Sequence, residues 1–202
     1  MYIVLFIAVI TVSGVSLAGY QYMQKTNHAR EASVVAEQQF MEQMTSHHID
    51  AIEMAQLAEQ KAQTTSVKTL AGGIIVAQTQ EVARMKTWYK QWYRKAIPEM
   101  AMMPGMMMND GMDMNKLSSA SDFDLEFIDQ MLTHHESAVT MAKAILPKAV
   151  HQDITTLANS IITTQSQEIA QMKILKAGFE QYPAGSAGRH TLDCANDSPG
   201  SC

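Results

Sequence analysis

The stretch Phe40-Met-Glu-Gln-Met-Thr-Ser-His-His-Ile-Asp-Ala-Ile-Glu-Met-Ala55 decides the fold, because its pattern returns in Phe127-Ile-Asp-Gln-Met-Leu-Thr-His-His-Glu-Ser-Ala-Val-Thr-Met-Ala142. The two stretches align without a gap at an offset of 87 residues. The same offset also aligns residues 70–86 with residues 157–173. A register kept across two separate segments predicts that the chain contains two copies of one structural unit.

Each unit is predicted to form two helices. Its apolar residues recur at intervals of three and four, and its interior is rich in Ala, Gln, Glu, Lys and Met. The predicted helices span 31–62, 67–95, 122–149 and 154–182. Long helices joined by short turns within each unit predict an all-α protein, an antiparallel four-helix bundle made of two helical hairpins. The repeats then cover 31–95 and 121–182.

Capping residues support these helix boundaries. Ser66 and Asp153 stand at matched positions of the two units, where each is predicted to cap the second helix. Ser121, with Asp124 three residues later, is predicted to cap the first helix of the second unit. Pro147 is expected to end or kink that helix near Leu146.

The connection between the units, residues 98–116, is a methionine-rich loop. Pro104, Gly105 and Gly111 disfavour a regular helix there, so these side chains have few ways to be buried. A thioether is a soft, polarizable ligand that selects Cu(I) and its congener Ag(I). The loop therefore predicts copper binding, against the alternatives of a plain linker or an adhesive surface for a partner protein. Eight of the seventeen methionines of the chain lie in it: Met100, Met102, Met103, Met106, Met107, Met108, Met112 and Met114.

Metal-binding side chains also recur on the helices. A helical period of 100° per residue places Met44, His47, His48 and Met54 on one broad face. Met85, with Gln78 and Glu81, occupies one face of the next helix, so the two helices can bring imidazoles, thioethers and a carboxylate together. Methionine at helical spacing is often core filler, and one histidine of each doublet can be a solvated rim residue. A doublet that occurs twice favours metal binding, and the matching candidates are Met131, His134, His135, Met141 and Met172.

Composition narrows the classes of function. The net charge of −5 over 202 residues argues against binding to nucleic acid or to an anionic membrane surface. A di-iron bundle enzyme needs Glu-x-x-His on two helices, and the chain has no such motif. The covalent haem signature Cys-x-x-Cys-His is also absent, although non-covalent haem stays open as an alternative.

The termini differ from the body of the chain. Residues 1–18 carry no charge and predict either a cleaved signal peptide or an N-terminal membrane anchor. A periplasmic or secreted protein is therefore expected, touching a membrane only through that segment if it is not cleaved. The bundle would occupy residues 19–182. Residues 183–202 are predicted to be a flexible tail, in which Cys194 and Cys202 either form a disulfide or stay as thiols.

The pattern F-x-x-Q-M-x-x-H-H-x-x-A-x-x-M-A, followed by Q-x-Q-E-x-x-x-M, resembles the CopM-like His/Met-rich four-helix proteins of the bacterial copper-resistance family. The resemblance covers about residues 40–173. It implies an exported, non-enzymatic protein that binds Cu(I), and Ag(I) as a mimic, through methionine and histidine. It also implies a role in copper tolerance, with a copper exporter or another copper carrier as the expected partner.

Overall fold

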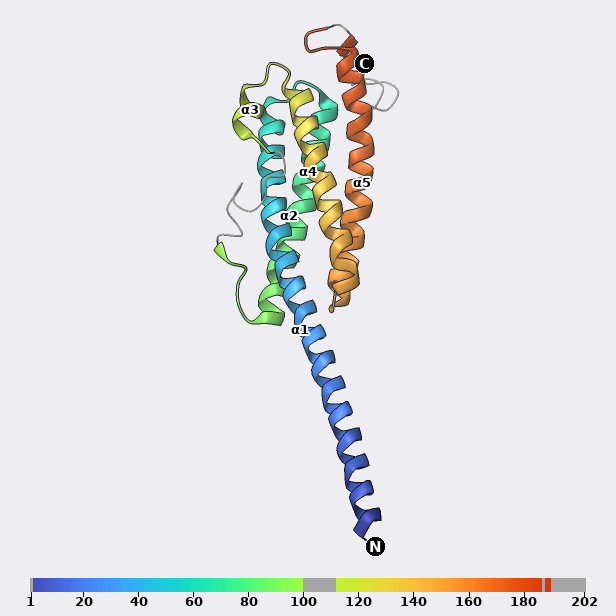
Figure 1. Ribbon diagram of the computed structural model, residues 1–202. Helices are drawn as coiled ribbons and strands as arrows, with labels where there is room; N and C mark the ends of the chain where they lie inside the picture. Colours follow the sequence, from blue (N-terminus) through green and yellow to red (C-terminus); the bar gives the residue numbers. More distant parts are fainter. Residues whose placement is uncertain (1, 100–111, 187, 190–202) are drawn as a thin grey trace.

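The protein is a bundle of helices in which two hairpins pack side by side (Figure 1). The computed structural model describes residues 2–99, 112–186 and 188–189. Helices α1 and α2 form one hairpin, α4 and α5 form the other, and α1 packs against α4. No strand occurs in these described ranges, and the predicted all-α four-helix bundle is confirmed. The helices are α1 (Tyr2–Lys61), α2 (Thr65–Tyr93), α3 (Met114–Ser119), α4 (Phe123–Ile145), the short 3₁₀ helix Leu146–Lys148, and α5 (Gln152–Gln181).

Helix α1 is much longer than predicted. It begins at Tyr2 rather than near Glu31, and Figure 1 shows its first half extending beyond the bundle. Within the part of the chain that the structure describes, no helix has both the length and the hydropathy of a membrane span. The assignment of residues 1–18 as signal peptide or anchor stays a prediction.

Two predicted helix starts are displaced by two residues. The N-cap of α2 is Thr64, whose side chain accepts a hydrogen bond from the Val67 N–H, so the prediction of Ser66 was wrong. The N-cap of α5 is His151, the matched position in the second repeat, rather than Asp153. Sequence favoured serine and aspartate as local caps, but the N–H groups at the N-cap positions Thr64 and His151 donate to carboxylates that are distant in sequence.

Helix α4 begins and ends close to its predicted boundaries. Its N-cap is Asp122 rather than Ser121, and the Asp122 carboxylate accepts a hydrogen bond from the Leu125 N–H. The helix ends at Ile145, and the chain continues as the 3₁₀ helix that contains Pro147. The prediction that Pro147 ends the helix near Leu146 is confirmed, because proline cannot supply the hydrogen bond that would continue it.

Each hairpin supplies a carboxylate that caps the second helix of the other hairpin. Asp124 accepts hydrogen bonds from the N–H groups of Gln63 and Thr64, both at 2.9 Å. Glu37, at the equivalent position of the first repeat, accepts hydrogen bonds from the Val150 N–H at 2.5 Å and the His151 N–H at 2.7 Å. Both carboxylates are buried. The N–H groups at the starts of α2 and α5 therefore gain these carboxylate acceptors only when the two hairpins have packed together.

His151, which has no predicted role in the sequence analysis, takes part in this junction. Its Nδ1 lies 2.7 Å from Glu37 Oε2, and its ring stacks on Trp92 with centroids 3.9 Å apart and planes 2° apart. Tyr93 donates a hydrogen bond to the same Glu37 oxygen at 3.2 Å. The side chain of His151 therefore holds the start of α5 against the end of α2.

The interior consists of two apolar clusters with polar residues between them. The Phe127 cluster includes Phe127, Met131 and Met172, and the Phe40 cluster includes Phe40 and Met44. On each of the four bundle helices, the residues between the two clusters are polar and include histidine, glutamine or glutamate. We call this the central layer. It contains His47, His48, Gln78, Glu81, His134, His135, Gln165 and Glu168.

We expect Asp124→Ala to lower the free energy of unfolding by about 1–3 kcal/mol, because two N–H groups at the start of α2 lose their acceptor. Urea denaturation followed by circular dichroism measures the change. The control is Asp153→Ala, an exposed position in the first turn of α5, which should change stability by no more than about 0.5 kcal/mol. Equal losses in the two variants would contradict a capping role for Asp124.

Candidate metal centre

The two histidine doublets meet in the middle of the bundle. His47 and His48 come from α1, His134 and His135 come from α4, and all four are at most 1% exposed. The ring centroids of His47 and His134 lie 3.6 Å apart, with their planes tilted by 43°. The doublets predicted as parts of two units thus form one shared site at the contact between α1 and α4.

Glutamates from the second helix of each hairpin contact the outer histidines. The Nε2 of His48 lies 2.7 Å from Glu81 Oε2, and the Nε2 of His135 lies 2.8 Å from Glu168 Oε2. Because a carboxylate accepts hydrogen bonds, the ring nitrogen Nε2 is the donor in each pair. The sequence placed Glu81 on the inward face but did not identify its bond to His48, which joins residues 33 positions apart.

This bond fixes which ring nitrogen can bind a metal. Among the residues that the structure describes, the buried Nδ1 atoms of His48 and His135 have no hydrogen-bond partner. A proton on Nδ1 would be a buried donor without an acceptor, which costs free energy, so the tautomer with its proton on Nε2 is favoured. Nδ1 then carries a lone pair, as a metal ligand requires.

The surroundings of His47 favour the neutral form of its imidazole. Burial, followed by the neighbouring imidazoles of His134, His48 and His135, lowers the pKa of His47 well below its usual value of 6.5. A charged His47 would be poorly solvated and close to other ionisable rings. It is therefore neutral at pH 7.

The helix methionines divide between the two ends of the central layer. Met44 and Met85 lie in the Phe40 cluster, and Met131 and Met172 lie in the Phe127 cluster. All four are completely buried. Met44 and Met131 each precede a doublet by one helical turn, so a thioether lies beside the histidines at both ends of the layer.

Met54 and Met141 each lie in or against the apolar cluster opposite to the one beside the methionine that precedes their own doublet. Met54, predicted to act with the first doublet, lies in the Phe127 cluster with the methionines of the second repeat. Met141 packs against the Phe40 cluster and is only partly buried. Sequence alone missed this arrangement, because each lies about two helical turns beyond its doublet and the hairpins run in opposite directions.

The loop methionines are only partly described. Met112 and Met114 are half-buried against the Phe127 cluster. The predicted ligands Met100, Met102, Met103, Met106, Met107 and Met108 lie outside the described residues, as do Cys194 and Cys202.

The donor atoms of the centre are mainly nitrogen and sulfur. Within the described ranges, no group of three or more His, Cys, Asp or Glu side chains is arranged to hold a metal ion. A di-iron or magnesium site would need such a group of oxygen ligands. Imidazole nitrogen with thioether sulfur suits a soft monovalent ion instead.

A polar pocket of about 190 Å³ lies between α2 and α5 and leads to this layer. Its lining includes both glutamates that contact the histidines, Glu81 and Glu168, together with Gln78 and Gln165. The two glutamine amides are at most 3% exposed, and their nitrogen and oxygen atoms have no hydrogen-bond partner in the described part of the chain. Buried amides of this kind are available to a polar ligand.

The comparisons with known proteins agree with this fold. Residues 37–176 match the family model described as a domain of unknown function (DUF305). The structure of CopM in the Cu(II)-bound form is 42% identical, with a TM-score of 0.66, over 71% of this chain and 97% of that chain. An Ag-bound form is 39% identical over 73% and 98% of the two chains, with a TM-score of 0.64. The Cu(I)-bound form is 40% identical over 72% and 96%, with a TM-score of 0.63. No curated protein sequence matches the chain. The resemblance expected from the doubled motif is confirmed.

We expect the metal-free protein to lose stability as the pH falls below about 6.5, the value for a histidine in the unfolded chain. The unfolded state then binds a proton that the buried His47 does not, because its pKa in the fold is lowered. The slope contributed by one histidine is at most about 1.4 kcal/mol per pH unit. Urea denaturation at a series of pH values measures it.

His47→Asn should flatten this slope, whereas His28→Asn, at an exposed position on the projecting part of α1, should leave it unchanged. An identical pH dependence in the wild type and in His47→Asn would show that His47 is not the group that titrates.

Proposed function

We propose that this chain, which belongs to the DUF305 family, binds Cu(I), with Ag(I) as a mimic, as an exported and non-enzymatic protein of copper tolerance. The observation that carries the proposal is the central layer, where four buried histidines meet and two of them are held by glutamates through Nε2. CopM, which is similar over most of the chain, has been solved in Cu(I)-, Cu(II)- and Ag-bound forms.

The glutamates explain how the layer is prepared for a metal. A histidine that binds a metal through one ring nitrogen usually donates the other N–H to a carboxylate, which orients the ring and makes it more basic. The pairs of His48 with Glu81 and of His135 with Glu168 have this arrangement. The Nδ1 atom of His48 or of His135, together with thioether sulfur, supplies the donors we assign to Cu(I).

Charge also favours a monovalent cargo. An isolated ion in a buried layer is costly unless opposite charge lies nearby. Glu81 and Glu168 are one hydrogen bond away from the assigned ligands, and their carboxylates offset the charge of a bound Cu(I). The pocket between α2 and α5 is lined by both glutamates, so we assign it as the route by which the ion reaches the histidines.

The protein would capture and hand on copper rather than transform a substrate. The loop methionines at positions 100–108 would hold Cu(I) weakly, as entry sites, because a loop must be ordered on binding. The buried helix ligands are held by packing and would bind more tightly. Release by ligand exchange would deliver the ion to a copper exporter or another carrier, outside the cytoplasm if residues 1–18 direct export.

The burial of the helix methionines disfavours the alternative of a partner-binding bundle with an adhesive methionine face. Met44, Met54, Met85, Met131 and Met172 are all completely buried, so a partner could not reach them on the folded protein. The same burial brings thioether sulfur next to the histidine layer, as metal binding requires.

An anaerobic titration of Cu(I) against a competing chromogenic chelator tests the function. The full chain should compete with the chelator, and changing His48 and His135 together to glutamine should remove the tight component. Changing the methionines within 100–108 to leucine should remove only a weak component, while His28→Gln serves as the matched control. A wild-type protein that fails to compete would overturn the copper proposal.

The glutamates should tune affinity without binding the ion. Glu81→Ala and Glu168→Ala are each expected to lower Cu(I) affinity about 10–100-fold, because the histidine loses the acceptor that orients it. Glu81→Gln keeps an acceptor without the charge, so its affinity should lie between those of wild type and Glu81→Ala. The chelator competition measures each affinity, and circular dichroism checks the fold. Wild-type affinity in both alanine variants would separate the glutamates from the metal site.

A further inference from the structure

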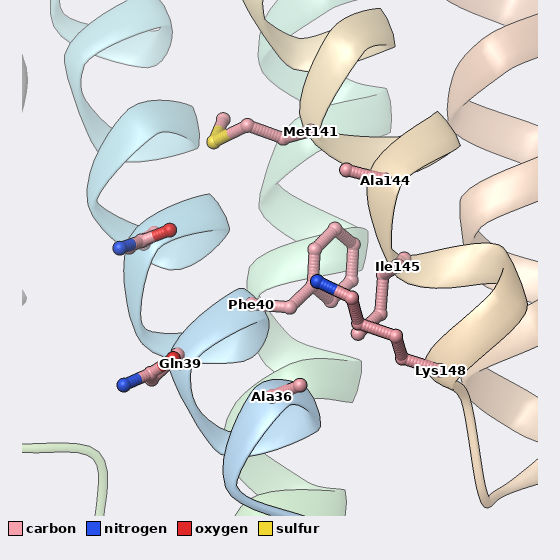
Figure 2. A pocket seen from close by; sticks show the side chains of 8 residues that line it. Ala36, Gln39, Phe40, Met141, Ala144, Ile145 and Lys148 are labelled. Carbon is pink, nitrogen blue, oxygen red and sulfur yellow. The ribbon is translucent and has the colours of Figure 1, made fainter. Parts of the chain in front are cut away.

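A groove between α1 and α4 lies at the end of the bundle where α4 terminates (Figure 2). Its volume is about 160 Å³. Phe40 and Ile145 form an apolar floor between the two helices, Met141 reaches from α4 toward α1, and Lys148, from the 3₁₀ helix that follows α4, extends over the floor (Figure 2). Gln43 completes the polar rim.

The internal repeat supplies a second copy of this groove at the other end of the bundle. The offset of 87 residues relates Phe40 to Phe127, Gln43 to Gln130, Met141 to Met54, and Lys148 to Lys61. Helices α1 and α4 therefore form both grooves, one near each end of the bundle. Four of the eight lining residues therefore keep their type in the second groove, whereas its other four positions are Phe123, Glu126, Leu57 and Ala58 in place of Ala36, Gln39, Ala144 and Ile145.

The second groove is filled by the chain itself. Gln130 accepts a hydrogen bond from the Asp113 N–H at 2.8 Å and donates one to the Asp113 carbonyl at 3.1 Å. Lys61 donates a hydrogen bond to the Ser118 carbonyl at 2.8 Å. Between these contacts, Leu117 of α3 is completely buried in the Phe127 cluster. One short turn of helix is thus held by its backbone and by a single leucine.

Burial of the equivalent residues differs between the two grooves. Gln130 is 6% exposed beneath α3, whereas Gln43 is exposed. Met54 is completely buried, whereas Met141 is only partly buried. The difference arises because the chain before Phe123 folds back as α3, whereas α1 continues straight through the equivalent position (Figure 1).

We propose that the groove formed by Phe40, Gln43, Met141, Ile145 and Lys148 binds a short helical turn of a partner protein. The chemistry of that turn follows from the filled groove: a polar N-cap whose backbone groups meet Gln43, a leucine or methionine four residues later, and a carbonyl that accepts from Lys148. The inference rests on the internal repeat and is independent of copper binding.

One difference in sequence between the two grooves, Gln39 in place of Glu126, indicates which charge the partner's helical turn should carry. In the filled groove, Lys116 of α3 forms an ion pair with Glu126 at 2.9 Å. The equivalent residue of the open groove is Gln39, while the lysine of the rim is present in both as Lys61 and Lys148. The open groove therefore favours a neutral or acidic residue where α3 has lysine, because Lys148 has no nearby counterpart of Glu126 to balance it.

The test uses two labelled peptides with the sequence of residues 112–121, one natural and one carrying Lys116→Glu. Fluorescence anisotropy with the full-length protein measures their affinities. Both peptides should bind, and the Lys116→Glu peptide should bind more tightly. Lys148→Met and Gln43→Ala should each weaken binding of the Lys116→Glu peptide at least about fivefold, the effect of losing one hydrogen bond. Lys143→Glu, at an exposed position of α4 outside the groove, should change affinity by less than about twofold.

Other outcomes overturn the proposal. Failure of both peptides to bind would exclude this docking chemistry. Loss of binding in Gln130→Ala, with no change in Gln43→Ala, would show that the peptide enters the filled groove by displacing α3. Self-association that Lys148→Glu abolishes, seen by sedimentation without peptide, would assign the groove to a second copy of the chain. Thermal melting of each variant checks that the bundle stays folded.

Discussion

Four buried histidines at the contact between the hairpins, two of them bonded to glutamates, are the constraint around which the bundle is built. A polar layer in the interior costs free energy unless its groups are paired and its surroundings are well packed. The His48–Glu81 and His135–Glu168 pairs satisfy one nitrogen of each outer ring. The Phe40 and Phe127 clusters, one at each end of the layer, provide the apolar burial that offsets its cost.

The exchange of capping carboxylates makes the two hairpins interdependent. Asp124 accepts hydrogen bonds from N–H groups at the start of α2 and Glu37 from those at the start of α5, so each hairpin supplies acceptors to the other. The same packing brings His47 onto His134. A lone hairpin would therefore expose half of the central layer to water and remove the carboxylate acceptors from the start of its second helix, which links the integrity of the central layer to the folding of the whole bundle.

Features that depend on residues close together in the chain were predicted correctly from the sequence. The helical period, the doublets and the effect of Pro147 all depend on neighbours within a few turns, and the fold and the inward histidines followed from them. The features that were missed join distant segments. Thr64 caps α2 in place of Ser66 where Asp124 arrives from the other hairpin, and the glutamates reach the histidines across 33 positions. Helix α3 was missed because its only strong signal, Asp113 as N-cap, lies in a loop where the methionines dominate.

The two repeats have similar residues in the central layer and different residues at the ends of the bundle. The similar residues include the candidate metal ligands, and the different residues line the grooves. The doublets, their glutamates and the adjacent methionines occur in both repeats, so a metal in the central layer meets similar donors from either hairpin. At the ends, Gln39 stands where the other repeat has Glu126, and Ala36 stands where it has Phe123. These differences accompany a covered groove in one repeat and an open groove in the other. Because the layer and the open groove share α1 and α4 but no side chain, substitutions at one should leave the other intact, and ion binding and partner binding can be separated by mutation.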